Sequence, residues 1–318
     1  MQTALPLLRR AWQLDRPLTG TSLLMLALLP LAAAGLVLDD RLIAGAPAWL
    51  KPAKFMASTA LYGLTLVWVL SWLESWPRLR RIVSRLTAAV FVIEVAIICL
   101  QAWRGTTSHF NVSTVLDGLL FSIMGAAIAA QTIASGAVAV ALFRQRIDDP
   151  MMAAALRSAM VITLLGASTG GLMTSPSKAQ IQDAVEHGRM TVSGSHTVGA
   201  ADGGPGIPGT GWSREHGDLR VPHFVGLHAM QALPLLGLWL RRRGVRDPRR
   251  LHVAAASYAA FFGVLLLQAL RGEPVLAPGP VVSTLLAAWA IATLAGWVSA
   301  TRASWNGSSA AQRAGGLA

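Results

Sequence analysis

The histidines are the side chains whose positions most strongly suggest chemistry. Histidine is the commonest metal ligand, a frequent haem ligand, and the side chain that exchanges protons near neutral pH. Of seven histidines in the chain, six fall in or beside segments that we expect on one side of a membrane: His109, His187, His196, His216, His223 and His228. This distribution predicts a histidine-containing site at one end of the protein.

Two of these histidines stand near the start of an apolar segment that Pro222 opens. Proline is typical of the first turn of a helix, so His223 lies at the helix start and His228 more than one turn inside it. Their five-residue separation places the rings about 140° apart around a helix. They therefore need ligands from elsewhere in the chain. The alternative for His228 is a simple hydrogen bond to a neighbouring helix, although Gln231 shares its face.

His109 is the best partner for them, in a short polar segment between two apolar ones. Arg104 precedes it and Asp117 follows it. An ordinary polar loop is the alternative interpretation. His196 lies in a long Gly- and Pro-rich segment, residues 174–221, and long segments of this kind are usually either functional lids or disordered. Both interpretations of His196 remain open.

Glu94 lies midway along the third apolar segment. A carboxylate at this depth in a bilayer is costly unless it is neutral, paired or hydrated, and so indicates function. Gln101 shares its helix face, and His228 and Arg271 are candidate partners. Lys54 abuts the second apolar segment. Anchoring at the membrane surface explains the neighbouring Lys51 well and Lys54 less well.

These residues divide by expected role. We expect acid–base groups at Glu94 and Asp117. The expected contacts to a cofactor or anionic ligand are Lys54, Gln101, Arg104, Gln231 and Arg271. The expected ligands of haem or a divalent metal ion are His109, His196, His223 and His228.

The composition indicates which kind of element positions these side chains. The 318 residues are 53% hydrophobic and only 13% charged, whereas soluble proteins carry about 25% charged residues. The net charge of +12 resides in short basic clusters between apolar segments, which is a pattern of membrane orientation and not of nucleic-acid binding. The single cysteine, Cys99, cannot form an internal disulfide bond.

Eight apolar segments are long enough to cross a bilayer. They cover residues 18–38, 55–74, 86–103, 115–143, 156–173, 222–240, 251–270 and 281–300. The sequence therefore predicts an all-α integral membrane protein with eight transmembrane helices. Gly166 and Gly170, in the fifth segment, are spaced for a close helix–helix contact.

Basic residues alternate between the two sides of these segments. Eighteen of the 27 Lys and Arg residues lie on the side that carries both termini. The positive-inside rule then places both termini in the cytoplasm and the histidines outside. The richness in Arg and Ala over Lys favours a bacterial source, and so the bacterial inner membrane.

The chain contains a candidate internal repeat. Residues 100–105 (LQAWRG) match 267–272 (LQALRG), and residues 50–55 match 219–224 more loosely. The match predicts two parallel four-helix halves, 1–150 and 151–318, the second carrying the long outer loop. Chance similarity between apolar sequences is the alternative.

Three functions are compatible with this pattern. The first is a haem- or metal-binding redox protein, in which Arg104 and Arg271 pair with a propionate, a quinone or another anionic group. The second is a transporter of a small molecule or a proton-coupled carrier, which suits tandem halves and a buried Glu94. The third is a membrane assembly or scaffold protein. The partners we expect are the lipid bilayer and a quinone or anionic small molecule, and not nucleic acid.

Overall fold

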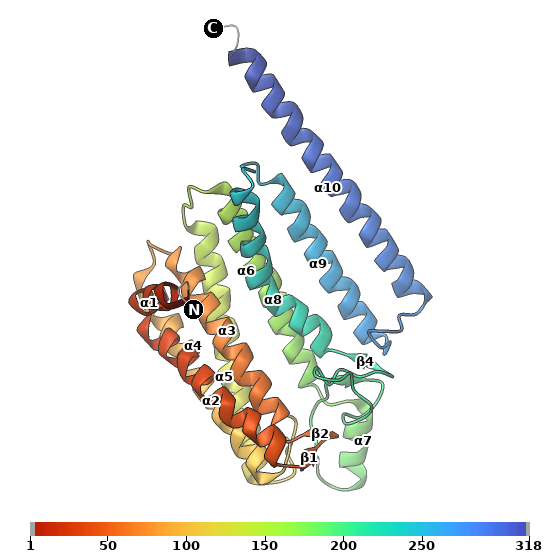
Figure 1. Ribbon diagram of the computed structural model, residues 1–318. Helices are drawn as coiled ribbons and strands as arrows, with labels where there is room; N and C mark the ends of the chain where they lie inside the picture. The colour runs from red at the N-terminus through yellow and green to blue at the C-terminus, as the bar shows by residue number, and fades with distance from the viewer. Residues whose placement is uncertain (1–3, 316–318) are drawn as a thin grey trace.

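Over its described residues the protein is a bundle of long helices with two small two-stranded sheets at one end (Figure 1). The computed structural model describes residues 4–315, with side chains over residues 6–302. The helices are α1 (Ala4–Leu14), α2 (Arg16–Leu38), α3 (Leu50–Ser71), α4 (Pro77–Arg104), α5 (Val115–Arg144), α6 (Pro150–Met173), α7 (Lys178–Glu186), α8 (Arg220–Arg242), α9 (Arg249–Leu270) and α10 (Pro280–Gly315). The strands are β1 (Leu42–Ile43), β2 (Ala46–Pro47), β3 (Thr197–Val198) and β4 (Gly217–Asp218).

Within the described residues, eight helices are long and apolar enough to cross a membrane, which confirms the expected all-α membrane architecture. Several begin earlier than the apolar segments do. The third expected segment began at 86, but α4 begins at Pro77; the fifth began at 156, but α6 begins at Pro150. Proline at the first helical position favours these starts, and Asp149 caps α6 through the backbone N–H groups of its first turn.

A short helix that the apolar segments did not predict precedes the first long one. Asp15 separates them, because its side chain accepts a hydrogen bond from the backbone N–H of Leu18 at 3.0 Å and so caps α2. The preceding helix α1 is amphipathic and lies at an angle to α2 (Figure 1). Such a helix is typical of the membrane–water interface.

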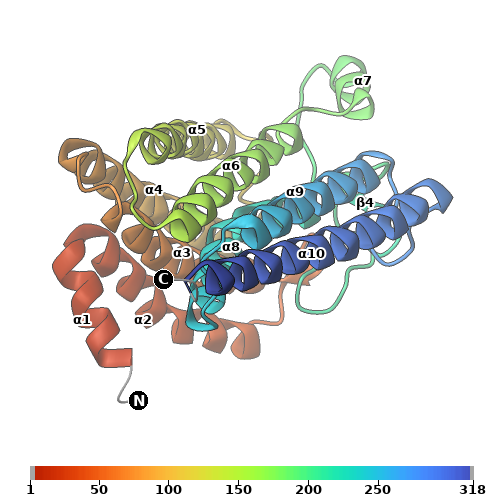
Figure 2. The same ribbon diagram turned by 90° about the horizontal axis from the view of Figure 1, so that it is seen from above.

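Each long helix packs on the next long helix in the chain. The long loop, which contains α7, lies between α6 and α8 in the sequence. Helix α3 packs on α2 and α4, and α4 packs on α5. Helix α6 packs most extensively on α8, which α9 and then α10 follow. Figure 2 shows α6 between α5 and α9. The largest apolar core joins residues of α3, α5, α6 and α8, including Leu66, Leu142, Leu156 and Met230.

Glycine lets α6 and α8 approach closely. A Cβ atom added to Gly166 would lie 2.6 Å from the backbone of Gly226. The contact confirms the expected role of Gly166, and Gly170 faces the same helix, because a Cβ there would lie 3.8 Å from His223 Cε1. This close approach fixes the position of the first turns of α8, which carry His223.

The two ends of the bundle differ in their connections. We call the end formed by residues 39–49, 105–114, 174–219 and 271–279 the histidine end, and the end formed by residues 72–76, 145–149 and 243–248 the arginine end. The long connection at the histidine end is folded: it contains α7 and pairs β3 with β4. Figure 1 shows the histidine end at the bottom.

Candidate functional site

His109 meets a lysine from another helix at the histidine end. Lys51, in the first turn of α3, places Nζ 3.0 Å from His109 Nδ1. His109 Nδ1 also lies 3.1 Å from the Ser108 hydroxyl, which can donate to it. Burial, followed by the electrostatic influence of Lys51, His196 and His223, holds the pKa of His109 well below its usual value. His109 is therefore a neutral imidazole.

His196 forms a pair with Asp202 in the long connection. Its Nδ1 lies 2.6 Å from Asp202 Oδ2 and must donate to that carboxylate. Asp202 also accepts from the backbone N–H groups of His196 and Thr197 and from the Ser195 hydroxyl, which fixes it in place. Burial lowers the pKa of His196 although Asp202 opposes that change. In the neutral ring, Nε2 carries a lone pair.

His223 is fixed against α6. Its Nδ1 lies 2.8 Å from the backbone carbonyl of Gly166 and 3.1 Å from the Thr169 hydroxyl. A carbonyl only accepts, so Nδ1 carries the proton and Nε2 again carries a lone pair. The structure gives no hydrogen-bond partner to Nε2 of His196 or His223 within residues 6–302.

Phe110 lies between two of these histidines. Its ring centroid is 4.8 Å from that of His196 and 6.0 Å from that of His109. Phe110 adopts a left-handed backbone conformation with φ of 64°, which is uncommon for a bulky residue. Four separate stretches of chain thus form one group, which we call the histidine cluster: Lys51, His109, His196, Asp202 and His223.

His228 occupies a different environment. Its Nδ1 lies 3.2 Å from Gln231 Oε1, and its ring lies 4.1 Å from that of Phe224. Gln231 in turn donates to Thr65 on α3. The predicted sharing of one face by His228 and Gln231 is therefore confirmed, and the two residues link α8 to α3.

Three of the expected polar residues form a second group. Arg104 Nη1 lies 2.6 Å from Asp117 Oδ1, and Gln101 Nε2 donates to the same oxygen at 2.8 Å. Thr114 caps α5 and donates to the other carboxylate oxygen. Asp117 is buried and both its oxygens are occupied, so these contacts join the end of α4 to the start of α5.

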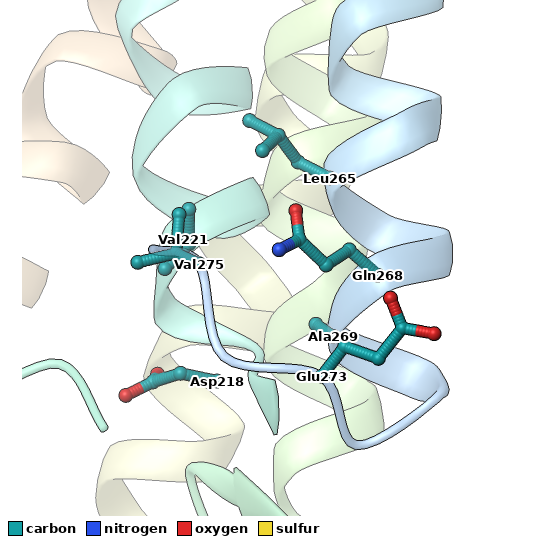
Figure 3. A pocket seen from close by; sticks show the side chains of 7 residues that line it. All are labelled: Asp218, Val221, Leu265, Gln268, Ala269, Glu273 and Val275. Atoms are coloured by element: carbon teal, nitrogen blue, oxygen red, sulfur yellow. The ribbon is translucent and has the colours of Figure 1, made fainter. Parts of the chain in front are cut away.

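Arg271 occupies the position that matches Arg104 but contacts a different partner. Its Nε donates to Glu273 at 2.6 Å, and Glu273 also accepts from the backbone N–H of Gly279. Gln268, the counterpart of Gln101, donates to the carbonyl of Pro274. Gln268 and Glu273 line a small crevice with the other side chains labelled in Figure 3, and this crevice has no room for even a water molecule.

The long connection is attached to the helices by several polar contacts. Lys54 Nζ donates to the carbonyl of Thr210 at 2.8 Å. Arg220 forms an ion pair with the fully buried Asp218 and also donates to the carbonyl of Gly211. These bonds fold the connection over the start of α3 and α8. The connection is thus folded onto the helices, and a role for His196 in closing a site stays a prediction.

Sequence reasoning missed two members of the histidine cluster. Lys51 was interpreted as a surface anchor, and Asp202 received no role. Lys51 lies one turn before Lys54 on the same helix, so the spacing of the two lysines indicated that they share a helix face. Asp202 lies six residues after His196 within an irregular loop, and no pattern relates two such positions before the loop is folded.

Glu94 is buried without a partner. Only 2% of its surface is exposed, and neither carboxylate oxygen has a hydrogen-bond partner among the described side chains and backbone. Neither of the partners considered for it contacts it: His228 bonds Gln231, and Arg271 bonds Glu273. Glu94 lies ten residues before Arg104 in α4, about 15 Å along the helix, so it lies deeper in the bundle than the histidine cluster.

Buried polar residues lie along one face of α4 on both sides of Glu94. Ser84, Thr87, Glu94 and Gln101 are all buried and recur at intervals of three or seven residues, which keeps them on one side of a helix. Ser84 donates to Asp15, and Thr87 donates to Gln131 on α5. The face extends for about 25 Å along the helix axis.

Among the described residues, no group of three or more His, Cys, Asp or Glu side chains is arranged to hold a metal ion.

In comparisons with known proteins, the chain matches no family model, no curated protein and no solved structure.

Proposed function

We propose that this chain is a proton-coupled transporter of the bacterial inner membrane. In this proposal both termini lie in the cytoplasm, because the arginine end carries the basic clusters, and the histidine end faces outward. Protons pass between the histidine cluster and Glu94. The observation that carries the proposal is the polar face of α4, whose one unpaired member is a buried ionisable acid.

The histidine cluster and Glu94 both have the chemistry that proton transfer needs. The neutral imidazoles of His196 and His223 carry Nε2 lone pairs that can take a proton from the outer solution. Glu94 lies deeper and is buried with no hydrogen-bond partner among the described residues. A charge that appears in the nearby cluster acts on such a buried acid with little screening by solvent.

Hydroxyl and amide groups continue the face toward the arginine end. Tyr62 lies 3.4 Å from Ser135 Oγ, and Gln131 connects Ser135 to Thr87. Apolar side chains separate these groups from Glu94, since Phe91 packs against Tyr62. Protons therefore cross only when water enters or the helices move, which is the behaviour of a gated carrier and not of an open channel.

Matching turns support a tandem arrangement of the two halves. Gly105 and Gly272 follow α4 and α9 at an offset of 167 residues and have φ of 74° and 73°. The N–H group of each glycine bonds to the carbonyl three residues before it, and the next N–H bonds to the preceding glutamine carbonyl in both halves. Parallel repeats of this kind are common in transporters.

The test is proton movement in proteoliposomes that contain a pH-sensitive dye. An imposed membrane potential should acidify vesicles that carry the wild-type protein faster than protein-free vesicles. Glu94→Gln keeps the size of the side chain and removes its proton exchange, so acidification should fall to the protein-free rate. Glu74→Gln, at an exposed position of the arginine end, is the matched control and should leave the rate unchanged.

A flux that Glu94→Gln leaves unchanged would contradict the proposal. So would a wild-type protein that moves no protons under any imposed pH gradient or potential. Infrared difference spectra of wild type minus Glu94→Gln, recorded across pH, give an independent measure of whether this carboxyl group titrates.

A second candidate function is metal or haem binding by His196 and His223. Metal-ligating histidines usually donate their other ring N–H to a carboxylate or a carbonyl, and these two do so to Asp202 and Gly166. Metal content and a visible spectrum of the purified protein test this function. Loss of bound metal or colour in both His196→Ala and His223→Ala, but not in His187→Ala, supports it; a colourless, metal-free wild type contradicts it.

A further inference from the structure

A groove at the arginine end lies apart from the histidine cluster. It runs between the end of α5, the first half of α6 and the first half of α9, and it has a volume of about 730 Å³. Its walls are mostly apolar and include Phe143, Val161 and Ala256. Phe143 and Val161 are 58% and 40% exposed, so apolar surface continues from the groove onto the outside of the bundle.

Two basic side chains line this groove, Arg157 and His252. Arg157 lies seven residues into α6, about 10 Å from its first residue. An arginine at this depth needs partners, because burial of a guanidinium in lipid is costly. Its Nε and Nη2 donate to the carbonyls of Leu142 and Gln145 at the end of α5. For Nη1 no partner is found in the side-chain range 6–302.

We propose that this groove binds one anionic phospholipid, with the lipid phosphate at Arg157 and His252 and an acyl chain along the apolar wall. Guanidinium groups match the geometry of phosphate oxygens, and basic pockets between membrane helices are known to hold anionic head groups. No acidic side chain lines the groove to oppose a phosphate. The apolar wall begins beside Arg157 and leads along α6 and α9, as an acyl chain attached to that phosphate requires.

The charge of the groove decides between classes of lipid. A zwitterionic lipid brings a positive head group to a site that already carries Arg157, whereas phosphatidylglycerol brings only the phosphate charge. The groove lies at the arginine end of the bundle, which also carries the largest group of arginines, in residues 241–250. The surface there attracts anionic lipid. Binding therefore selects for head-group charge and not for chain length.

Native mass spectrometry of the delipidated protein tests this inference. With phosphatidylglycerol added, the wild type should retain one lipid per chain, and it should retain phosphatidylcholine about tenfold less well, which corresponds to one charge-assisted contact. Arg157→Gln should lower phosphatidylglycerol retention by a similar factor. Arg146→Gln is the control, because Arg146 is 93% exposed on the neighbouring connection and lies outside the groove.

Ala256→Trp separates lipid binding from folding. Ala256 is exposed on the groove wall, so tryptophan there fills the groove without touching the carbonyl contacts of Arg157. The variant should fold, as a thermal transition shows, and should lose the bound lipid. Equal retention of both lipids, an unchanged retention in Ala256→Trp, or a dimer of the chain that forms only when Ala256 is intact would overturn the proposal.

Discussion

Lys51 and His109 are 58 residues apart in the sequence, yet Lys51 Nζ lies 3.0 Å from His109 Nδ1. The contact brings the basic group of Lys51 to a buried ring. It also connects α3 to the segment between α4 and α5. The contact therefore contributes to the electrostatics of the histidine cluster and joins two of the elements that form it.

Removal of the Lys51 charge should raise the pKa of His109. Burial is the largest cause of the lowered pKa and Lys51 is the next, so Lys51→Met removes one cause and leaves burial in place. NMR titration of histidine-labelled protein measures the change. Lys178→Met, an exposed position on α7, should leave the His109 titration where it is in the wild type. An equal response to both variants would show that Lys51 has no specific effect.

The protein should lose stability as pH falls below the usual histidine pKa of 6.5. The folded protein keeps His109 and His196 neutral because their pKa values are lowered, whereas the unfolded chain binds protons at both positions. The free energy of unfolding should then fall by about 1.4 kcal/mol per pH unit for each such proton. Above that pH the contribution is fully present.

Thermal unfolding in detergent between about pH 8 and pH 5 measures this loss. His109→Asn keeps an acceptor for Lys51 and removes one titrating group, so its transition temperature should depend less steeply on pH. A variant as steep as the wild type would place the titrating group elsewhere.

Glu94 should destabilise the fold that contains it. Glu94→Met replaces two unpaired buried oxygens by an apolar side chain of similar size and should raise the free energy of unfolding by about 1–3 kcal/mol. Gln101→Met is the matched variant on the same helix face, but Gln101 bonds Asp117 and Arg104. It should lower stability by a similar amount. Changes of the same sign in both variants would contradict the assignment of Glu94 as unpaired.

The contact between α6 and α8 should tolerate no side chain at Gly166. A Cβ atom there meets the backbone of Gly226 at 2.6 Å, so Gly166→Ala must push the helices apart and should cost about 1–3 kcal/mol of stability. Gly125→Ala, on α5, has open space at the same position and should stabilise its helix by about 1 kcal/mol. Thermal unfolding of the two variants under identical conditions compares them directly.

Sequence patterns were sufficient for those features that depend on local composition. Apolar runs of about twenty residues predict the eight described helices that are long and apolar enough to cross a membrane, because a bilayer requires that length whatever the packing. Helical periodicity predicts that Glu94 and Gln101 share a face, and that His228 and Gln231 do. Small residues at Gly166 and Gly170 predict a close helix contact, although the sequence does not name the partner helix.

Only the tertiary structure decided which side chains meet. It joins His109, His196 and His223 and assigns His228 to another environment, a division that histidine positions along the chain do not contain. It also pairs Asp117 with Arg104 and leaves Glu94 without a hydrogen-bond partner among the described residues. The physical reason is that contacts between loops depend on the folded path of residues 174–219, whose conformation follows from many weak polar contacts and not from a repeating pattern.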